Sequence, residues 1–215
     1  MEERSKGARP PVGDRQRARS VEALRGVASK HGGDARVERG AKAAAARSVA
    51  PPGEPASSDE LEDFRYLTAI FGASYIVARA DGELSEEERR HLFAALAMLT
   101  GDRVSVESVE NLIELSEQSL REVDFETAIT SLVHAFKTRD DREVALTLAL
   151  GTAAADGHVD ESELATLGAL ARAFGIPPDR SKLIYQEVFL ALAEARAAAA
   201  AEADAAADIA ADAAR

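Results

Sequence analysis

The sequence predicts an all-α protein: a seven-helix bundle built from two pseudo-symmetric helix-loop-helix repeats and preceded by a disordered N-terminal arm. Three observations lead to this prediction. Hydrophobic residues make up 46% of the chain but aromatic residues only 5%, so the core must be mostly Ala, Leu, Val and Ile, which favours closely packed helices. From Asp59 onward, apolar residues recur at spacings of three and four, the period of one helical face. Residues 74–101 and 149–176 also align without gaps and share an Asp-Gly dipeptide.

Composition divides the chain into three parts. Residues 1–58 are rich in Gly, Pro, Arg and Ser and have little apolar periodicity, so we expect a disordered arm with a transient helix over residues 20–32. The arm carries a net charge of +5, whereas the rest of the chain carries −17. Residues 59–195 form the predicted helical domain. Residues 196–215 are an Ala/Glu/Asp low-complexity tail that has good helix propensity but no apolar face to pack.

The helical pattern indicates two central helices and five peripheral ones. The segments that begin near Asp59 and Arg142 are apolar nearly all round, so we expect them at the centre of the bundle. The other segments are amphipathic, and Phe125 and Leu164 are among the residues expected to face the core. Gly175 should end the sixth helix. The seven predicted helices begin near Asp59, Ser85, Ser105, Asp124, Arg142, Asp160 and Pro178.

Each repeat contains an Asp-Gly loop that helix capping explains almost completely. The glycine of each dipeptide stands where a helix ends, a position that favours the left-handed backbone conformation. In the first repeat Ser85-x-x-Glu88 matches a capping box, in which the cap side chain and the later carboxylate each accept a backbone N–H. In the second repeat Asp160-x-x-Glu163 does the same. Only the aspartates that precede the two glycines have no role under this interpretation.

The same loops also match part of a calcium-binding EF-hand, which is the alternative interpretation. With Gly82 at loop position 6, Asp81 and Glu88 stand at positions 5 and 12, where EF-hand ligands are found. Positions 1 and 3 are then Val77 and Arg79, whose side chains carry no oxygen, and the second repeat has a similar defect. A standard EF-hand is therefore excluded. What remains is a composite site for a divalent cation such as calcium, formed by carboxylates from both loops: Asp81, Glu88, Asp156 and Glu163.

Two Ala-Asp-Gly segments, which begin at Ala80 and Ala155, each end an apolar helix and open an amphipathic one within an acidic helical domain. In this arrangement the chain resembles the tellurite-resistance TerB family, which includes the TerB-like domain of a membrane-anchored co-chaperone. The resemblance covers Asp59 to Ala195, and "RAFGIPPDR" at residues 172–180 is similar to the family's Gly-aliphatic-Pro segment before the last helix. It implies a helical bundle, a role in tellurite or broader chemical stress, and acidic residues that bind metal. No His-Pro-Asp sequence is present, so neither a J domain nor direct stimulation of a chaperone ATPase is implied.

The sequence lacks the motifs of common enzyme classes. It contains no cysteine, which excludes disulfides and thiolate metal sites, and it has neither a Gly-rich phosphate loop nor Gly-x-Ser-x-Gly. We therefore expect a protein that is not an enzyme. Because no signal peptide and no membrane-spanning run is visible, we also expect a cytoplasmic protein that reaches membranes only through a partner.

Three functions remain open. The first is a TerB-like stress-response module that binds a divalent metal at the acidic end formed by the two Asp-Gly loops. The second is a metal-free adaptor that docks protein partners. The third is a nucleic-acid tether through the basic residues 1–58, although the acidic body and the absence of aromatic residues in the arm argue against a nucleic-acid partner. A solvated tail, or association of the arm with the acidic body, is the alternative for that region.

Overall fold

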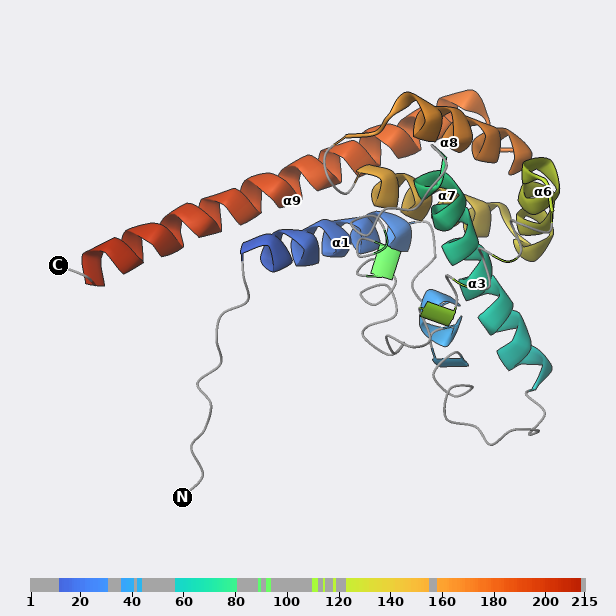
Figure 1. Ribbon diagram of the computed structural model, residues 1–215, viewed down its shortest axis with the longest axis horizontal. Coiled ribbons are helices and arrows are strands. Elements are labelled where there is room, and N and C mark those ends of the chain that lie inside the picture. The colour runs from blue at the N-terminus through green and yellow to red at the C-terminus, as the bar shows by residue number, and fades with distance from the viewer. Residues whose placement is uncertain are drawn as a thin grey trace, which may run out of the picture.

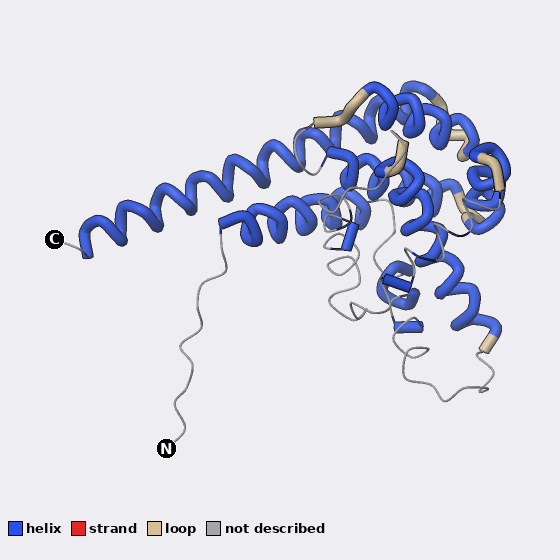
Figure 2. Tube along the Cα trace, viewed as in Figure 1, coloured by secondary structure: helices blue, strands red, loops and turns tan. Residues whose placement is uncertain are grey.

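The computed structural model describes residues 12–30, 36–40, 42–43, 57–80, 123–154 and 158–213, with a few isolated residues between 89 and 118. Every regular element in these ranges is helical, which confirms the all-α prediction (Figures 1 and 2). Within them, no helix has both the length and the hydropathy needed to cross a bilayer. The helices are α1 (Val12–Lys30), α3 (Ser58–Ala78), α6 (Phe125–Ala135), α7 (Arg139–Ala153), α8 (Glu161–Ala173) and α9 (Pro178–Ala213).

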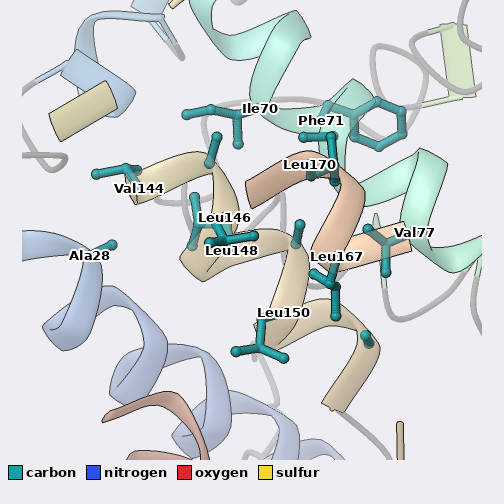
Figure 3. Close-up of a cluster of buried hydrophobic side chains, with 14 of the residues drawn as sticks. Ala28, Ile70, Phe71, Val77, Val144, Leu146, Leu148, Leu150, Leu167 and Leu170 are labelled. Atoms are coloured by element: carbon teal, nitrogen blue, oxygen red, sulfur yellow. The ribbon is translucent and has the colours of Figure 1, made fainter. Parts of the chain in front are cut away.

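Helix α7 lies at the centre of the bundle, as the sequence predicts. Twelve of its fifteen residues are buried, and it packs against α1, α3, α8 and α9. Helix α3, the other predicted central helix, is buried along most of its length. Figure 3 shows three leucines of α7, Leu146, Leu148 and Leu150, among apolar side chains of the neighbouring helices. Those neighbours include Ile70 and Phe71 of α3 and Leu167 and Leu170 of α8.

An ion-pair network joins the first turns of α3 and α7. Arg36 donates to the Asp141 carboxylate at 2.5 Å and to the Glu62 carboxylate at 3.2 Å. Lys137 Nζ also lies 2.6 Å from Glu62 Oε2. The guanidinium of Arg36 stands 4.5 Å from the ring centroid of the buried Tyr66, a cation–π arrangement. Because Glu62 and Asp141 each lie in the first turns of their helices, the two central helices start at the same end and run side by side in the same general direction.

The helix starts follow the capping residues in the sequence. Asp124 accepts a backbone N–H of the first turn of α6 at 2.8 Å, so it caps the helix that the sequence predicted to begin near this residue. Helix α8 begins with the predicted capping box, formed by Asp160 and Glu163. Helix α7 has a further capping box, Thr138 with Asp141, which the sequence analysis did not identify. Each box satisfies two backbone N–H groups that would otherwise have no partner within the helix.

Gly175 ends α8 as predicted, in the left-handed conformation with φ 67°. The N–H of Ile176 donates to the carbonyl of Ala171 at 2.9 Å, and the N–H of Gly175 donates to that of Arg172 at 3.0 Å. These two hydrogen bonds form a Schellman motif, in which the last helical carbonyls receive partners. Pro178 then occupies the first position of α9, where its missing N–H is not needed.

Two residues that we expected to face the core are partly exposed instead. Phe125 and Leu164 each expose 44% of their surface, so this part of the prediction is wrong. Both side chains belong to the first turns of their helices, and the packed faces begin one turn later. Ile129 in α6 is 7% exposed and Leu167 in α8 is fully buried.

Helix α1 and the C-terminal half of α9 form a pair that the sequence did not suggest (Figure 1). Within the arm of residues 1–58, the described residues 12–30 form a helix that overlaps the one predicted over residues 20–32 and buries Leu24 and Val27. The tail over residues 196–215, expected to have nothing to pack against, continues α9 to Ala213. Its first turns lie beside α1, whereas its last turns extend past the N-terminal end of α1, and Ile209 there is 69% exposed (Figure 1). Composition alone does not reveal such a pairing, because the two segments lie at opposite ends of the chain.

The predicted helices that begin at Ser85 and Ser105 fall mainly outside the described residues. Within the first of them Leu92 is 1% exposed and faces the core. Residues 81–88 and 155–157, which contain both Asp-Gly dipeptides, also lie outside the described ranges. The pseudo-symmetry of the two repeats therefore stays a prediction.

Candidate functional site

A pocket of about 230 Å³ opens at the end of the bundle where α3 finishes. Its walls come from the last turn of α3 and the turn that follows, from the start of α6, and from α8. The walls are mainly apolar, and a guanidinium and a hydroxyl are the polar groups among the described lining residues. These residues are Ile76, Arg79, Ala80, Val123, Phe125 and Thr166.

The pocket adjoins parts of both sequence repeats. Ala80 immediately precedes the Asp-Gly dipeptide of the first repeat, and Thr166 lies about one turn beyond Glu163 in the second. Since α3 and α7 run in the same general direction, the loops that follow them leave from the same end of the bundle. The fold therefore brings the start of the first loop close to the first turns of α8.

Hydrogen bonds order the first turn of α8, which contains Glu163. Asp160 Oδ1 accepts the Glu163 backbone N–H at 2.8 Å and the Ser162 hydroxyl at 2.7 Å, while Glu163 Oε2 accepts the Asp160 N–H at 2.9 Å. The hydrogen bond from the Glu163 backbone, followed by that from Ser162, holds the pKa of Asp160 below its ordinary value. His158 is exposed, and its proximity lowers the pKa of Asp160 further. Asp160 is therefore an anion at neutral pH.

Of the four carboxylates predicted to form a composite metal site, the described ranges contain Glu163, whose side chain belongs to the capping box. Asp81, Glu88 and Asp156 lie outside the described residues. Within the part of the chain that the structure describes, no three His, Cys, Asp or Glu side chains come together as metal ligands would. The convergence of the four carboxylates thus stays a prediction.

Sequence reasoning missed two features of this end. Val123 and Phe125 expose 37% and 44% of their surfaces at the pocket. Their position at the start of a helix could have indicated this exposure, since a first turn often extends beyond the packed core. Arg196 of α9 donates to the Ala154 carbonyl at 2.6 Å and so satisfies the C-terminus of α7 just before the second loop. No local pattern indicates this contact, because the two residues lie on separate helices.

The model of the family described as tellurite resistance protein TerB matches residues 67–186, which is more than half of the chain. The chain belongs to the TerB family. This confirms the resemblance drawn from the two Ala-Asp-Gly segments. The TerB match extends from α3 into the first turns of α9, so α1 and most of α9 lie outside it. No curated protein and no solved structure gives a significant match to the chain.

Proposed function

We propose that this TerB-family protein is a stress-response module, acting in tellurite or broader chemical stress, that binds a divalent cation such as Ca²⁺ between its two Asp-Gly loops. One observation carries the proposal. Ala80, the residue before the first Asp-Gly dipeptide, and Thr166, one turn after Glu163, line the same pocket. Two loops that approach one pocket can combine their carboxylates, whereas either loop alone has too few oxygen ligands.

The residues present fit a hard cation. The candidate ligands Asp81, Glu88, Asp156 and Glu163 are all carboxylates, and Ca²⁺ and Mg²⁺ prefer oxygen ligands. The hydrogen bond that Glu163 Oε2 accepts from the cap is compatible with this role, because a carboxylate has acceptor sites on two oxygens. A soft metal held by thiolates does not fit, since the chain contains no cysteine.

Calorimetric titration of the full chain with CaCl2, MgCl2 and MnCl2 tests the proposal. We expect saturable binding of one ion in the wild type, weakened at least tenfold in the double variant Asp81→Asn/Asp156→Asn. Glu161→Gln provides a matched control, because it removes one exposed carboxylate from the first turn of α8 without touching either Asp-Gly dipeptide. Absence of binding heat for all three cations, or equal affinity in the double variant, would contradict a metal role.

A metal-free adaptor is the second candidate, and the apolar rim of the pocket favours it. Val123 and Phe125 are the kind of partly exposed side chains that anchor protein partners. On this alternative, a partner captured from cells under chemical stress is retained in excess EDTA and in the aspartate double variant. It is lost in Phe125→Ser but kept in Leu190→Ser, a control that removes an exposed apolar side chain from α9.

The basic arm of residues 1–58 also helps to decide between a protein partner and a nucleic-acid partner. Arg19 of α1 forms an ion pair with Glu202 of α9, so this part of the basic arm associates with the acidic tail. This pairing supports a protein partner over a nucleic-acid tether. A nucleic-acid tether would require salt-sensitive binding that disappears when residues 1–58 are deleted.

A further inference from the structure

Two segments outside the TerB match meet the end of α7. The match covers residues 67–186, so α1 and the part of α9 beyond residue 186 lie outside it (Figure 1). Both segments contact the last turn of α7 or its C-cap, Ala154. The second Asp-Gly dipeptide follows at once, with Asp156 two residues after the cap. Contacts that hold this turn therefore fix the point from which the second loop leaves.

Helix α1 packs on this turn from one side. A Cβ atom added to Gly151 would lie 2.5 Å from each Leu24 methyl carbon and 3.0 Å from Leu24 Cγ, so the leucine lies directly on the α7 backbone. Leu24 is 4% exposed and belongs to the same core cluster as the leucines of α7. Because interiors are close-packed, a contact of this kind leaves the turn little room to shift.

Helix α9 holds the end of the same turn through Arg196. Arg196 Nη2 donates to the carbonyl of Ala154 at 2.6 Å. Ala154 is fully buried, and the last carbonyls of a helix have no partner within it, so an external donor is needed there. The guanidinium also brings a positive charge to the negative end of the helix dipole. One side chain thus meets both requirements of the α7 C-terminus.

The backbone that carries Arg196 is itself well packed. Leu192 and Ala195, on the same stretch of α9, are 1% and 8% exposed. About two turns further along, Glu202 forms an ion pair with Arg19 of α1. Arginine is suited to such a role because its planar fork of donors is preorganised and always charged. Arg196 is therefore directed at the end of α7 from a fixed position.

We propose that Arg196 is a positioning residue for the cation site: it fixes the C-terminus of α7 and thereby preorganises the second Asp-Gly loop for the cation. This inference rests on the proposed function, since it concerns the affinity of that same site. Preorganisation raises affinity by lowering the ordering cost of binding. A positive charge near a cation acts in the opposite direction. The sign of the effect therefore distinguishes positioning from electrostatic repulsion.

Calorimetric titration of full-length variants with CaCl2, MgCl2 and MnCl2 tests the inference. Arg196→Met keeps the length of the side chain but removes its charge and its donors, and we expect it to weaken cation binding about tenfold. Arg196→Lys keeps the charge and a donor, so its affinity should lie between those of the wild type and Arg196→Met. Arg172→Met is the matched control, because it makes the same change at an exposed position of α8 and should bind as the wild type does.

Hydrogen exchange of the cation-free chain separates this inference from the proposed function. Arg196→Met should accelerate exchange of the Ala153 and Ala154 amides about fivefold, since a hydrogen bond to a charged group is lost, and should leave the amides of α3 unchanged. Unchanged exchange at the two alanines would overturn the inference, even if the site binds a cation. Equal or tighter cation binding in Arg196→Met would overturn it too.

A wild type that binds none of the three cations would overturn the proposed function, and with it the effect of Arg196 on affinity. Faster exchange in Arg196→Met would then still show that Arg196 holds the end of α7. The two failures are therefore distinguishable, because one is read from the wild-type titration and the other from the exchange of the variant.

Discussion

Helix α7 and the C-terminal half of α9 are held by the fold in different ways: the second consists mainly of alanine, the best helix former, whereas the first contains Asp, Val, Thr and Gly as well. Helix α7 buries twelve of its fifteen residues among four neighbouring helices. The second half of α9 is mainly alanine, and none of its residues from 197 to 207 is buried. Burying a leucine side chain stabilises a protein by roughly 1.5–3 kcal/mol, and alanine offers much less apolar area. Propensity favours the helix in the second half of α9, whereas buried apolar area decides how firmly each of the two segments is held.

The largest effect should come from the α7 side of this comparison. Leu146→Ala removes a fully buried side chain from the centre of the bundle, and we expect it to lower the free energy of unfolding by about 2–5 kcal/mol. Leu190→Ala makes the same chemical change at a position of α9 that is 62% exposed, and should cost little. Urea denaturation followed by circular dichroism measures both. Equal losses would show that α7 is not the principal source of stability.

A smaller effect is expected at Glu143, a buried carboxylate of α7. It accepts from Arg139 Nε at 2.9 Å and lies 2.8 Å from Arg180 Nη2. Burial alone raises the pKa of Glu143, but the hydrogen bonds from Arg180 and Arg139 outweigh it and hold that pKa below its ordinary value. Glu143→Gln should cost about 1–2 kcal/mol at neutral pH, since both arginines are partly exposed and recover some hydration.

The same substitution predicts a change in acid stability. A carboxylate with a lowered pKa stabilises the fold fully above its unfolded pKa, and that contribution is lost as the pH falls through the folded value. The wild type should therefore lose stability below about pH 4.5 more steeply than Glu143→Gln, which has no such group to titrate. Urea denaturation series from neutral pH to about pH 3 give the two slopes. Parallel curves would mean that Glu143 does not contribute to the acid transition.

The smallest effect should come from the pairing of α1 with α9. Glu202→Ala removes the partner of Arg19, and both side chains are partly exposed, so overall stability should change by only about 0–1 kcal/mol. Hydrogen exchange of the α1 amides should nevertheless become faster. Asp204→Ala removes an exposed acid from the same stretch and serves as the control. A loss of global stability as large as that of Leu146→Ala would make the helix pair part of the central packing.

The elements that the sequence predicted well are those governed by local chemistry. Asp124, the Asp160–Glu163 capping box and the left-handed Gly175 all act within one helical turn, so their roles can be read from a few neighbouring residues. The apolar character of α3 and α7 also reports burial directly, because a helix without a polar face has to be covered. The family assignment rested on such local motifs and is confirmed by the match over residues 67–186.

Other features depended on packing between distant segments. Phe125 and Leu164 carry a core-like pattern but lie beyond the packed face, and only the ends of the neighbouring helices determine where that face begins. The pocket beside Ala80 forms where α3, α6 and α8 meet, so it has no signature in any one of them. For the candidate site, the sequence named the carboxylates, and their convergence stays a prediction because Asp81, Glu88 and Asp156 lie outside the described residues.

Residue types and their spacing were enough to establish that the chain is helical, where several helices begin and end, and which two are central. These properties follow from hydrogen bonds and side-chain periodicity within single segments. Tertiary structure decided that the two ends of the chain pair. Leu24 on α1 needs the missing side chain of Gly151 on α7, and Arg19 needs Glu202 on α9. Such complementarity exists only between surfaces, and a linear pattern does not record which surfaces will meet.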